Sequence, residues 1–99
     1  MGQHKIGSLT FHVDPNVPAV YVYLRDTDGF RSSKQVEVGE DVIVDLDAEG
    51  KLIGVELLGP ASLNIVLTTV VKKYHARELR QLERSRDVIE RVFHESMTA

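Results

Sequence analysis

Hydrophobic and polar residues alternate through most of the first sixty positions of the chain. The alternation is clear over 8–13, 34–38, 42–46 and 52–58, where about every second side chain is aliphatic or aromatic. A period of two is typical of strands that bury one face. Proline, glycine and acidic turn residues separate these runs. The pattern predicts an antiparallel β-meander of about five short strands over residues 8–58.

The segment 19–24 departs from this alternation because it is apolar on both sides. Val20, Val22 and Leu24 would point to one face, and Tyr21 and Tyr23 to the other. A strand without a polar face usually lies between two layers. We therefore expect its second side to be covered, by another part of the chain or by a partner.

A β-hairpin over 42–58 is the clearest local signal. Two β-branched runs flank Asp47-Ala48-Glu49-Gly50, which is turn-forming in composition. A two-residue loop at 49–50 predicts three facing pairs: Leu46 with Ile53, Val44 with Val55, and Val42 with Leu57. It leaves the acids on the opposite face: Asp45, Asp47 and Glu56. A three-residue loop with Gly50 as a bulge would shift the register by one.

The same run also fits a calcium-binding loop. Asp45, Asp47, Glu49, Gly50 and Glu56 have the spacing of an EF-hand loop. An EF-hand needs a helix on each side, however, and both flanks here are strand-like. No second copy of the pattern occurs in the chain, although EF-hands normally come in pairs. We expect the hairpin, with no metal and no other cofactor.

The C-terminal third predicts helix. Apolar residues recur at helical spacing over 62–73, although the β-branched composition of this segment favours a strand. The stretch 75–96 has no glycine or proline, and its stripe of Leu79, Leu82, Ile89 and Phe93 is typical of an amphipathic helix. Arg86 interrupts this stripe. The helix could pack across the sheet of its own chain, which we favour, or pair with a second copy at a dimer interface.

These elements predict an α+β fold: an antiparallel meander of about five strands, twisted or partly rolled, with C-terminal helical segments packed on it. The 99 residues suffice for a single domain, 1–99, with the meander at 8–58 and the helical part at 62–97.

Composition narrows the function classes. There is no cysteine, which excludes disulfides and thiolate chemistry. No signal-peptide-like or membrane-spanning stretch is present, so we expect a cytoplasmic protein without a membrane association. Residues 1–61 have a net charge of −5 and residues 62–99 of +2, which argues against nucleic acid as a partner. No nucleophile with a paired base and no small-molecule site emerges, so we expect no catalytic residues and no enzyme.

Part of the chain resembles a known family. The residues are Asp14-Pro15, Ala19-x-Tyr21-Val22-x-Leu24, Val36-x-Val38 and the run from Val44 to Glu56. Over about residues 11–60 they are similar to the bacterial and phage domain-of-unknown-function family 2283. Pro18 departs from the pattern, since the family usually has an acid before the alanine. Some members are encoded beside predicted ribonuclease-like toxins, so the resemblance implies an antitoxin or partner-binding role for such members.

We therefore predict a non-enzymatic protein–protein interaction module that self-associates, as a dimer, or binds another protein. The alternative is an antitoxin-like inhibitor of a small toxin or host protein. The candidate interaction surface joins the second face of 19–24 to the helix stripe: Tyr21, Tyr23, Leu79, Leu82, Arg86, Ile89 and Phe93.

Overall fold

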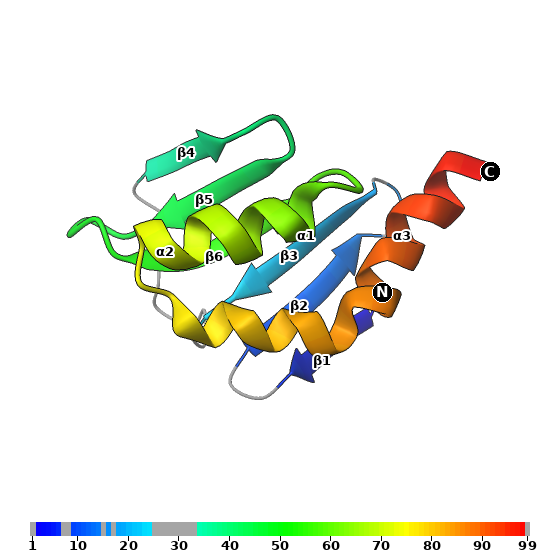
Figure 1. Cartoon of the computed structure of the whole chain (residues 1–99), viewed down its shortest axis with the longest axis horizontal. Helices are drawn as coiled ribbons and strands as arrows, with labels where there is room; N and C mark the ends of the chain where they lie inside the picture. Colours follow the sequence, from blue (N-terminus) through cyan, green and yellow to red (C-terminus); the bar gives the residue numbers. More distant parts are fainter. Residues whose placement is uncertain (1, 7–8, 15, 17, 25–33, 99) are drawn as a thin grey trace.

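A computed structural model describes residues 2–6, 9–14, 16, 18–24 and 34–98. It has two layers, a six-stranded antiparallel sheet and a set of helical segments that lie across one face of it (Figure 1). The strands are β1 (Gly2–Ile6), β2 (Leu9–Asp14), β3 (Ala19–Tyr23), β4 (Lys34–Val38), β5 (Val42–Leu46) and β6 (Leu52–Leu57). The α+β fold predicted from the sequence is confirmed.

The sheet is built from two groups of three consecutive strands. Its order is β1-β2-β3-β6-β5-β4, so β3 and β6 form the central pair that joins the groups. β1 was not among the predicted strands. Its sequence, Gly2-Gln3-His4-Lys5-Ile6, has only one strongly apolar residue, and it becomes a strand by backbone pairing with β2. Residues 25–33, between β3 and β4, lie outside the described residues.

The hairpin of β5 and β6 is confirmed, with a corrected turn and a corrected register at its end. The Gly50 N–H donates to the Asp47 carbonyl at 3.0 Å, and the Asp47 N–H donates to the Lys51 carbonyl at 2.9 Å. These bonds define a three-residue loop in which Gly50 has a φ of +82°. The Asp47 carboxylate holds the loop by accepting hydrogen bonds from the backbone N–H groups of Glu49 and Lys51.

A register shift next to this loop restores the predicted alignment farther along the strands. Leu46 pairs with Leu52, not with Ile53 as predicted, and the shift lies between Asp45 and Leu46. Beyond it, Val44 pairs with Val55 and Val42 with Leu57, as predicted. The three-residue loop and the shift thus offset each other, because each displaces the alignment by one residue. Asp47 is consequently a turn residue and not a member of the strand face.

The predicted helix over 62–73 is confirmed. It comprises α1 (Ser62–Ile65), a π-helical segment (Val66–Val70) and α2 (Val71–Lys73). The second predicted helix is divided: a 3₁₀-helix spans Arg77–Ser85 and α3 spans Arg86–Thr98. His75, at a φ of +55°, makes the corner between the two helical parts. No helix in the described part of the chain is long and apolar enough to cross a membrane.

The 3₁₀ winding has a simple cause in the sequence. Ala76, Leu79 and Leu82 are all buried and are spaced three residues apart. Three residues make one turn of a 3₁₀-helix, so this winding aligns them in one straight stripe against the sheet. The stripe continues in α3 through Ile89 and Phe93, which are also buried. The helical layer and the inner face of the sheet together enclose the hydrophobic core.

Candidate functional site

In the described part of the chain, the helices lie on one face of the sheet and none lies over the second face (Figure 1). We call it the open face. Directly paired residues in an antiparallel sheet point to the same side, so the strand registers place two rows of side chains across it. One row is Thr10, Tyr23, Gly54, Asp45 and Gln35; the other is His12, Tyr21, Glu56, Ile43 and Glu37. The rows run from β2 through the central strands to β4.

Two acidic side chains on this face lie close together. Asp45 on β5 is 6% exposed, and Gln35 on β4 donates from Nε2 to Asp45 Oδ1 at 2.8 Å and to Glu56 Oε2 at 3.0 Å. One amide group therefore bridges the carboxyl groups of two neighbouring strands. Burial, followed by the charge of Asp45 and a hydrogen bond with it, raises the pKa of Glu56 to about 7. The acid pair therefore retains a proton well above the usual range of a carboxyl group.

Aromatic side chains occupy the other half of the open face. Tyr23 lies against Gly54 of the next strand: a Cβ on Gly54 would be 3.0 Å from Tyr23 Cδ1 and 2.9 Å from the Val22 carbonyl oxygen. Glycine is therefore the residue that fits there beside the ring. Burial and the charges of Asp45 and Glu56 raise the pKa of Tyr23. Its neighbour Tyr21 is half-buried, and its ring centroid lies 6.2 Å from that of His12.

The predicted interaction residues divide between two places in the structure. Tyr21 and Tyr23 lie on the open face. The apolar members of the predicted helix stripe are instead in the core of their own chain, with at most 2% of each side chain exposed: Leu79, Leu82, Ile89 and Phe93. The helices therefore pack in cis, as we favoured. In the folded chain these four residues are not accessible to a partner.

Arg86 has a local role at the start of α3. Its guanidinium lies 2.7 Å from a carboxylate oxygen of Glu83 and 3.1 Å from one of Glu90, and its side chain is 29% exposed. Arg86 donates hydrogen bonds to both carboxylates, and these bonds raise its pKa, the one to Glu83 contributing most. The two carboxylates pair with the cation that interrupts the apolar stripe, and they join the 3₁₀-helix to the first turn of α3.

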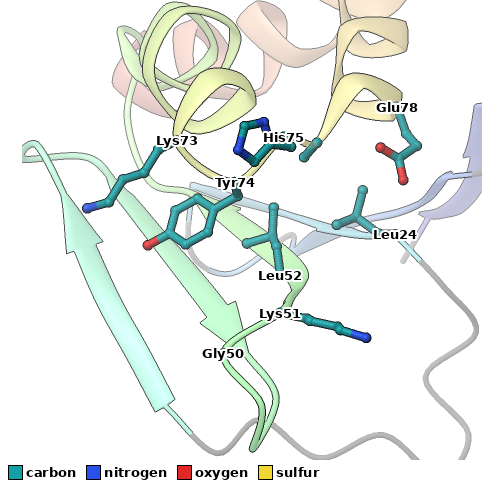
Figure 2. A pocket seen from close by; sticks show the side chains of 9 residues that line it. Leu24, Gly50, Lys51, Leu52, Lys73, Tyr74, His75 and Glu78 are labelled. Atoms are coloured by element: carbon teal, nitrogen blue, oxygen red, sulfur yellow. The ribbon is translucent and has the colours of Figure 1, made fainter.

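A shallow hollow lies at one end of the molecule, between the β5–β6 turn and the end of α2 (Figure 2). Tyr74, Leu52 and Leu24 line it, and Lys51 and Lys73 lie at its rim. The Lys73 ammonium sits 5.7 Å from the centre of the Tyr74 ring. The charged side chains around this hollow are exposed to solvent. They therefore remain hydrated and do not form a preorganised ligand site.

The described residues form no arrangement that could hold a metal ion. No three histidine, aspartate or glutamate side chains there are grouped as ligands of one ion. The acids of the suspected calcium loop have other contacts. Asp45 accepts from Gln35, Asp47 accepts from the turn backbone, and Glu56 shares the amide of Gln35.

The acid pair with its bridging amide is the feature that the sequence did not predict as a unit. The alternation already places Asp45 and Glu56 on one face of the hairpin and Gln35 on the outward face of its strand. What brings them together is the position of β4 next to β5, which sets Gln35 opposite Asp45. The signal was available only once the order of the strands was known.

Comparison with known proteins identifies the strand region. The family model described as a protein of unknown function (DUF2283) matches residues 11–59. These residues belong to the DUF2283 family. No curated protein and no solved structure matches the chain. The DUF2283 match runs from within β2 to just beyond β6, so it includes both rows of the open face except Thr10 and leaves the helical layer outside. The description of DUF2283 assigns no activity to these residues.

Proposed function

We propose that the chain is a non-enzymatic protein-binding module that self-associates, and that the open face of its sheet is the binding surface. One observation carries this proposal: the helices cover only one side of the sheet, and the other side presents half-buried tyrosines at its centre. A sheet with one apolar layer over it needs nothing more for a core. We therefore expect the aromatic residues on its second side to serve binding.

The chemistry of the open face suits a protein better than a small molecule. Tyrosine is enriched in protein interfaces because its ring supplies apolar contact area and its hydroxyl supplies a hydrogen bond. Neither of the hollows mapped on the described residues is lined by the tyrosines or the acids of this face, whereas small-molecule sites are concave. The absence of cysteine suits a module that works in the reducing cytoplasm.

Sedimentation velocity over a series of protein concentrations tests this proposal. We expect the sedimentation coefficient to rise with concentration in the wild type, and to rise less in the double variant Tyr21→Ser, Tyr23→Ser. The matched control is Val88→Ser, because Val88 is a large apolar residue exposed on the helical layer. A wild-type protein that stays monomeric up to millimolar concentration would contradict self-association. Equal effects of the double variant and of the control would contradict the open face as the surface.

A second candidate function is an antitoxin-like inhibitor that binds a small basic protein. It is favoured by the acidic half of the open face, where Glu37, Asp45 and Glu56 lie. Among the described residues of β4, β5 and β6, no lysine or arginine belongs to the two rows of this face. Such a half could accept hydrogen bonds and charge from a cationic partner. The test is co-expression with the product of an adjacent gene that encodes a small basic protein. A complex that Glu56→Gln and Asp45→Asn weaken supports this candidate, and separate elution of the two proteins counts against it.

A further inference from the structure

The two halves of the open face are chemically different. The half formed by β2 and β3 presents hydroxyl and ring groups in its middle, from Thr10, His12, Tyr21 and Tyr23. Asp14 lies in register with Ala19 at the end of this half. The half formed by β6, β5 and β4 presents Glu56, Asp45 and Glu37, together with Gln35. Tyrosine and threonine hydroxyls can donate hydrogen bonds, and ionised carboxylates only accept them. One half therefore complements the other.

The strand order places the boundary between these halves at the centre of the sheet. With six strands in the order β1-β2-β3-β6-β5-β4, the midline runs between β3 and β6. A symmetric dimer needs a surface that is complementary to itself across its two-fold axis. An axis along this midline, parallel to the strands, would lay β3 of one copy over β6 of the other and β2 over β5.

This stacking brings donors onto acceptors. Tyr21 pairs with Glu56 across β3 and β6 of one chain, so the two residues stand at the same height along the midline. After the two-fold rotation, Tyr21 faces Glu56 of the partner subunit. By the same rule Tyr23 stands over Gly54 of the partner subunit, and because each Tyr23 ring lies against Gly54 of its own chain, the two Tyr23 rings meet at the axis. Thr10 faces Asp45 of the partner subunit, because the two lie in one row at equal distances from the midline.

We propose that the occupant of the open face is a second copy of this chain, stacked face to face about a two-fold axis parallel to the strands, with the aromatic half of each sheet over the acidic half of the other. This inference rests on the proposed function and names the partner and its orientation. The alternative two-fold axis, perpendicular to the strands, would place β3 over β3 and acidic strands over acidic strands. Like charges facing each other across an interface disfavour it.

The size of the face sets the concentrations at which the dimer should form. Strands about 4.8 Å apart and residues about 3.4 Å apart give six strands of five residues a flat footprint of roughly 400 Å². Specific stable interfaces bury about 800 Å² of accessible surface on each partner. The footprint is about half of this area, so the contact should be weak. Measurements should therefore extend from micromolar to millimolar protein at low ionic strength.

A pair of opposite charges at position 21 tests the orientation. In the proposed dimer, the residue at position 21 faces Glu56 of the partner subunit. At a pH above the Glu56 pKa of about 7, where Glu56 is ionised, Tyr21→Glu would then set like charges against each other, and Tyr21→Lys would set opposite charges together. We expect sedimentation equilibrium to show a dissociation constant at least about tenfold higher for Tyr21→Glu than for Tyr21→Lys. We also expect a mixture of the two variants to associate no more tightly than Tyr21→Lys alone.

The competing arrangements give different results. If position 21 faces position 21 of the other copy, each variant alone repels itself and only the mixture dimerises. That result would overturn the orientation proposed here and leave the open face as the binding surface. Equal association of both variants would overturn the inference as well. If the wild type itself stays monomeric throughout, it is self-association that fails, and the open face then awaits a foreign protein.

Two controls keep the test interpretable. Thr69 is exposed on the helical layer, on the opposite side of the molecule from the open face. Thr69→Glu and Thr69→Lys should therefore leave the dissociation constant unchanged. Circular dichroism and denaturation of each variant at micromolar concentration check that the fold is intact, since Tyr21 also neighbours Glu56 within its own chain. A variant that is unfolded by this measure is replaced by its Tyr23 counterpart, Tyr23→Thr, which should weaken the dimer by removing the aromatic ring nearest the axis.

Discussion

The two faces of the sheet are built from alternate residues of the same strands, yet they differ in almost every physical respect. On β3, Val20 and Val22 are fully buried under the helices, whereas Tyr21 and Tyr23, which alternate with them, are half-buried on the open face. The covered face consists mainly of apolar residues, aliphatic apart from Phe11, that the chain itself removes from water. The open face holds an acid pair and aromatic rings that the chain leaves partly exposed. Stability should therefore depend on the covered face, and binding on the open one.

The largest expected effect is on the covered face. Phe93 in α3 is 2% exposed and belongs to the core, so Phe93→Ala should lower the free energy of unfolding by about 3–5 kcal/mol. The loss should not depend on protein concentration, because the residue is buried within one chain. Urea denaturation at two concentrations measures it. Val88→Ala, in the same helix but at an exposed position, should change stability by less than about 0.5 kcal/mol. A concentration-dependent loss for Phe93→Ala would mean that the helix packs against a second copy.

Two neighbouring residues of β3 compare the faces directly. Val22→Ala removes buried methyl groups from the covered face and should cost about 2–3 kcal/mol. Tyr21→Thr, which keeps a β-branched residue in the strand, should cost less than about 1 kcal/mol in dilute solution, where no partner is bound. Denaturation midpoints of the two variants under the same conditions give the comparison. If Tyr21→Thr proves as costly as Val22→Ala, the open face contributes to the fold as strongly as the core does, and the contrast between the faces fails.

The covered face was predictable from the sequence and the open face was only partly so. Periodic apolar residues gave the strands from β2 to β6, the helix over 62–73 and the burial of Leu82, Ile89 and Phe93, because burial on one side imposes a period on the sequence. β1 escaped prediction because a strand held by backbone pairing needs little hydrophobic pattern. The acid pair escaped it because Gln35, Asp45 and Glu56 come from three strands whose order is a tertiary property.

The hairpin turn determines which residues reach which face. Gly50 has a φ of +82°, with no other atom within 4 Å of the position a Cβ would take. Gly50→Val is therefore opposed by its backbone conformation alone and should cost about 1–3 kcal/mol. Gly50→Asn should cost less, since asparagine tolerates this region better than other residues. Thermal and urea denaturation of the two variants test this prediction. An unchanged midpoint for Gly50→Val would mean that position 50 needs no positive φ and that the turn is placed wrongly.

The smallest expected effect is the pH dependence of the acid pair. The pKa of Glu56 is raised to about 7 in the folded chain, first by burial and then by Asp45, so the folded state holds this proton more tightly than the unfolded state. The associated stability is fully present below the unfolded pKa of about 4.5 and is lost as the pH rises through about 7. The whole shift corresponds to about 3 kcal/mol. Because Glu56 is only partly buried, solvent screening should reduce the effect to on the order of 1 kcal/mol.

Glu56→Gln isolates this effect, because the amide cannot ionise. Among the described residues, the titratable groups that face Glu56 are Asp45, Tyr21 and Tyr23, and the charge of Asp45 is the one that raises the pKa of Glu56. In dilute protein, we expect the stability of the wild type relative to Glu56→Gln to fall between pH 5 and pH 8. Glu37→Gln, at an exposed position of the same face, should run parallel to the wild type. Parallel profiles for Glu56→Gln as well would show that the acid pair is as well hydrated as an ordinary surface carboxylate. The open face would then be polar, but it would hold no carboxyl group with a raised pKa.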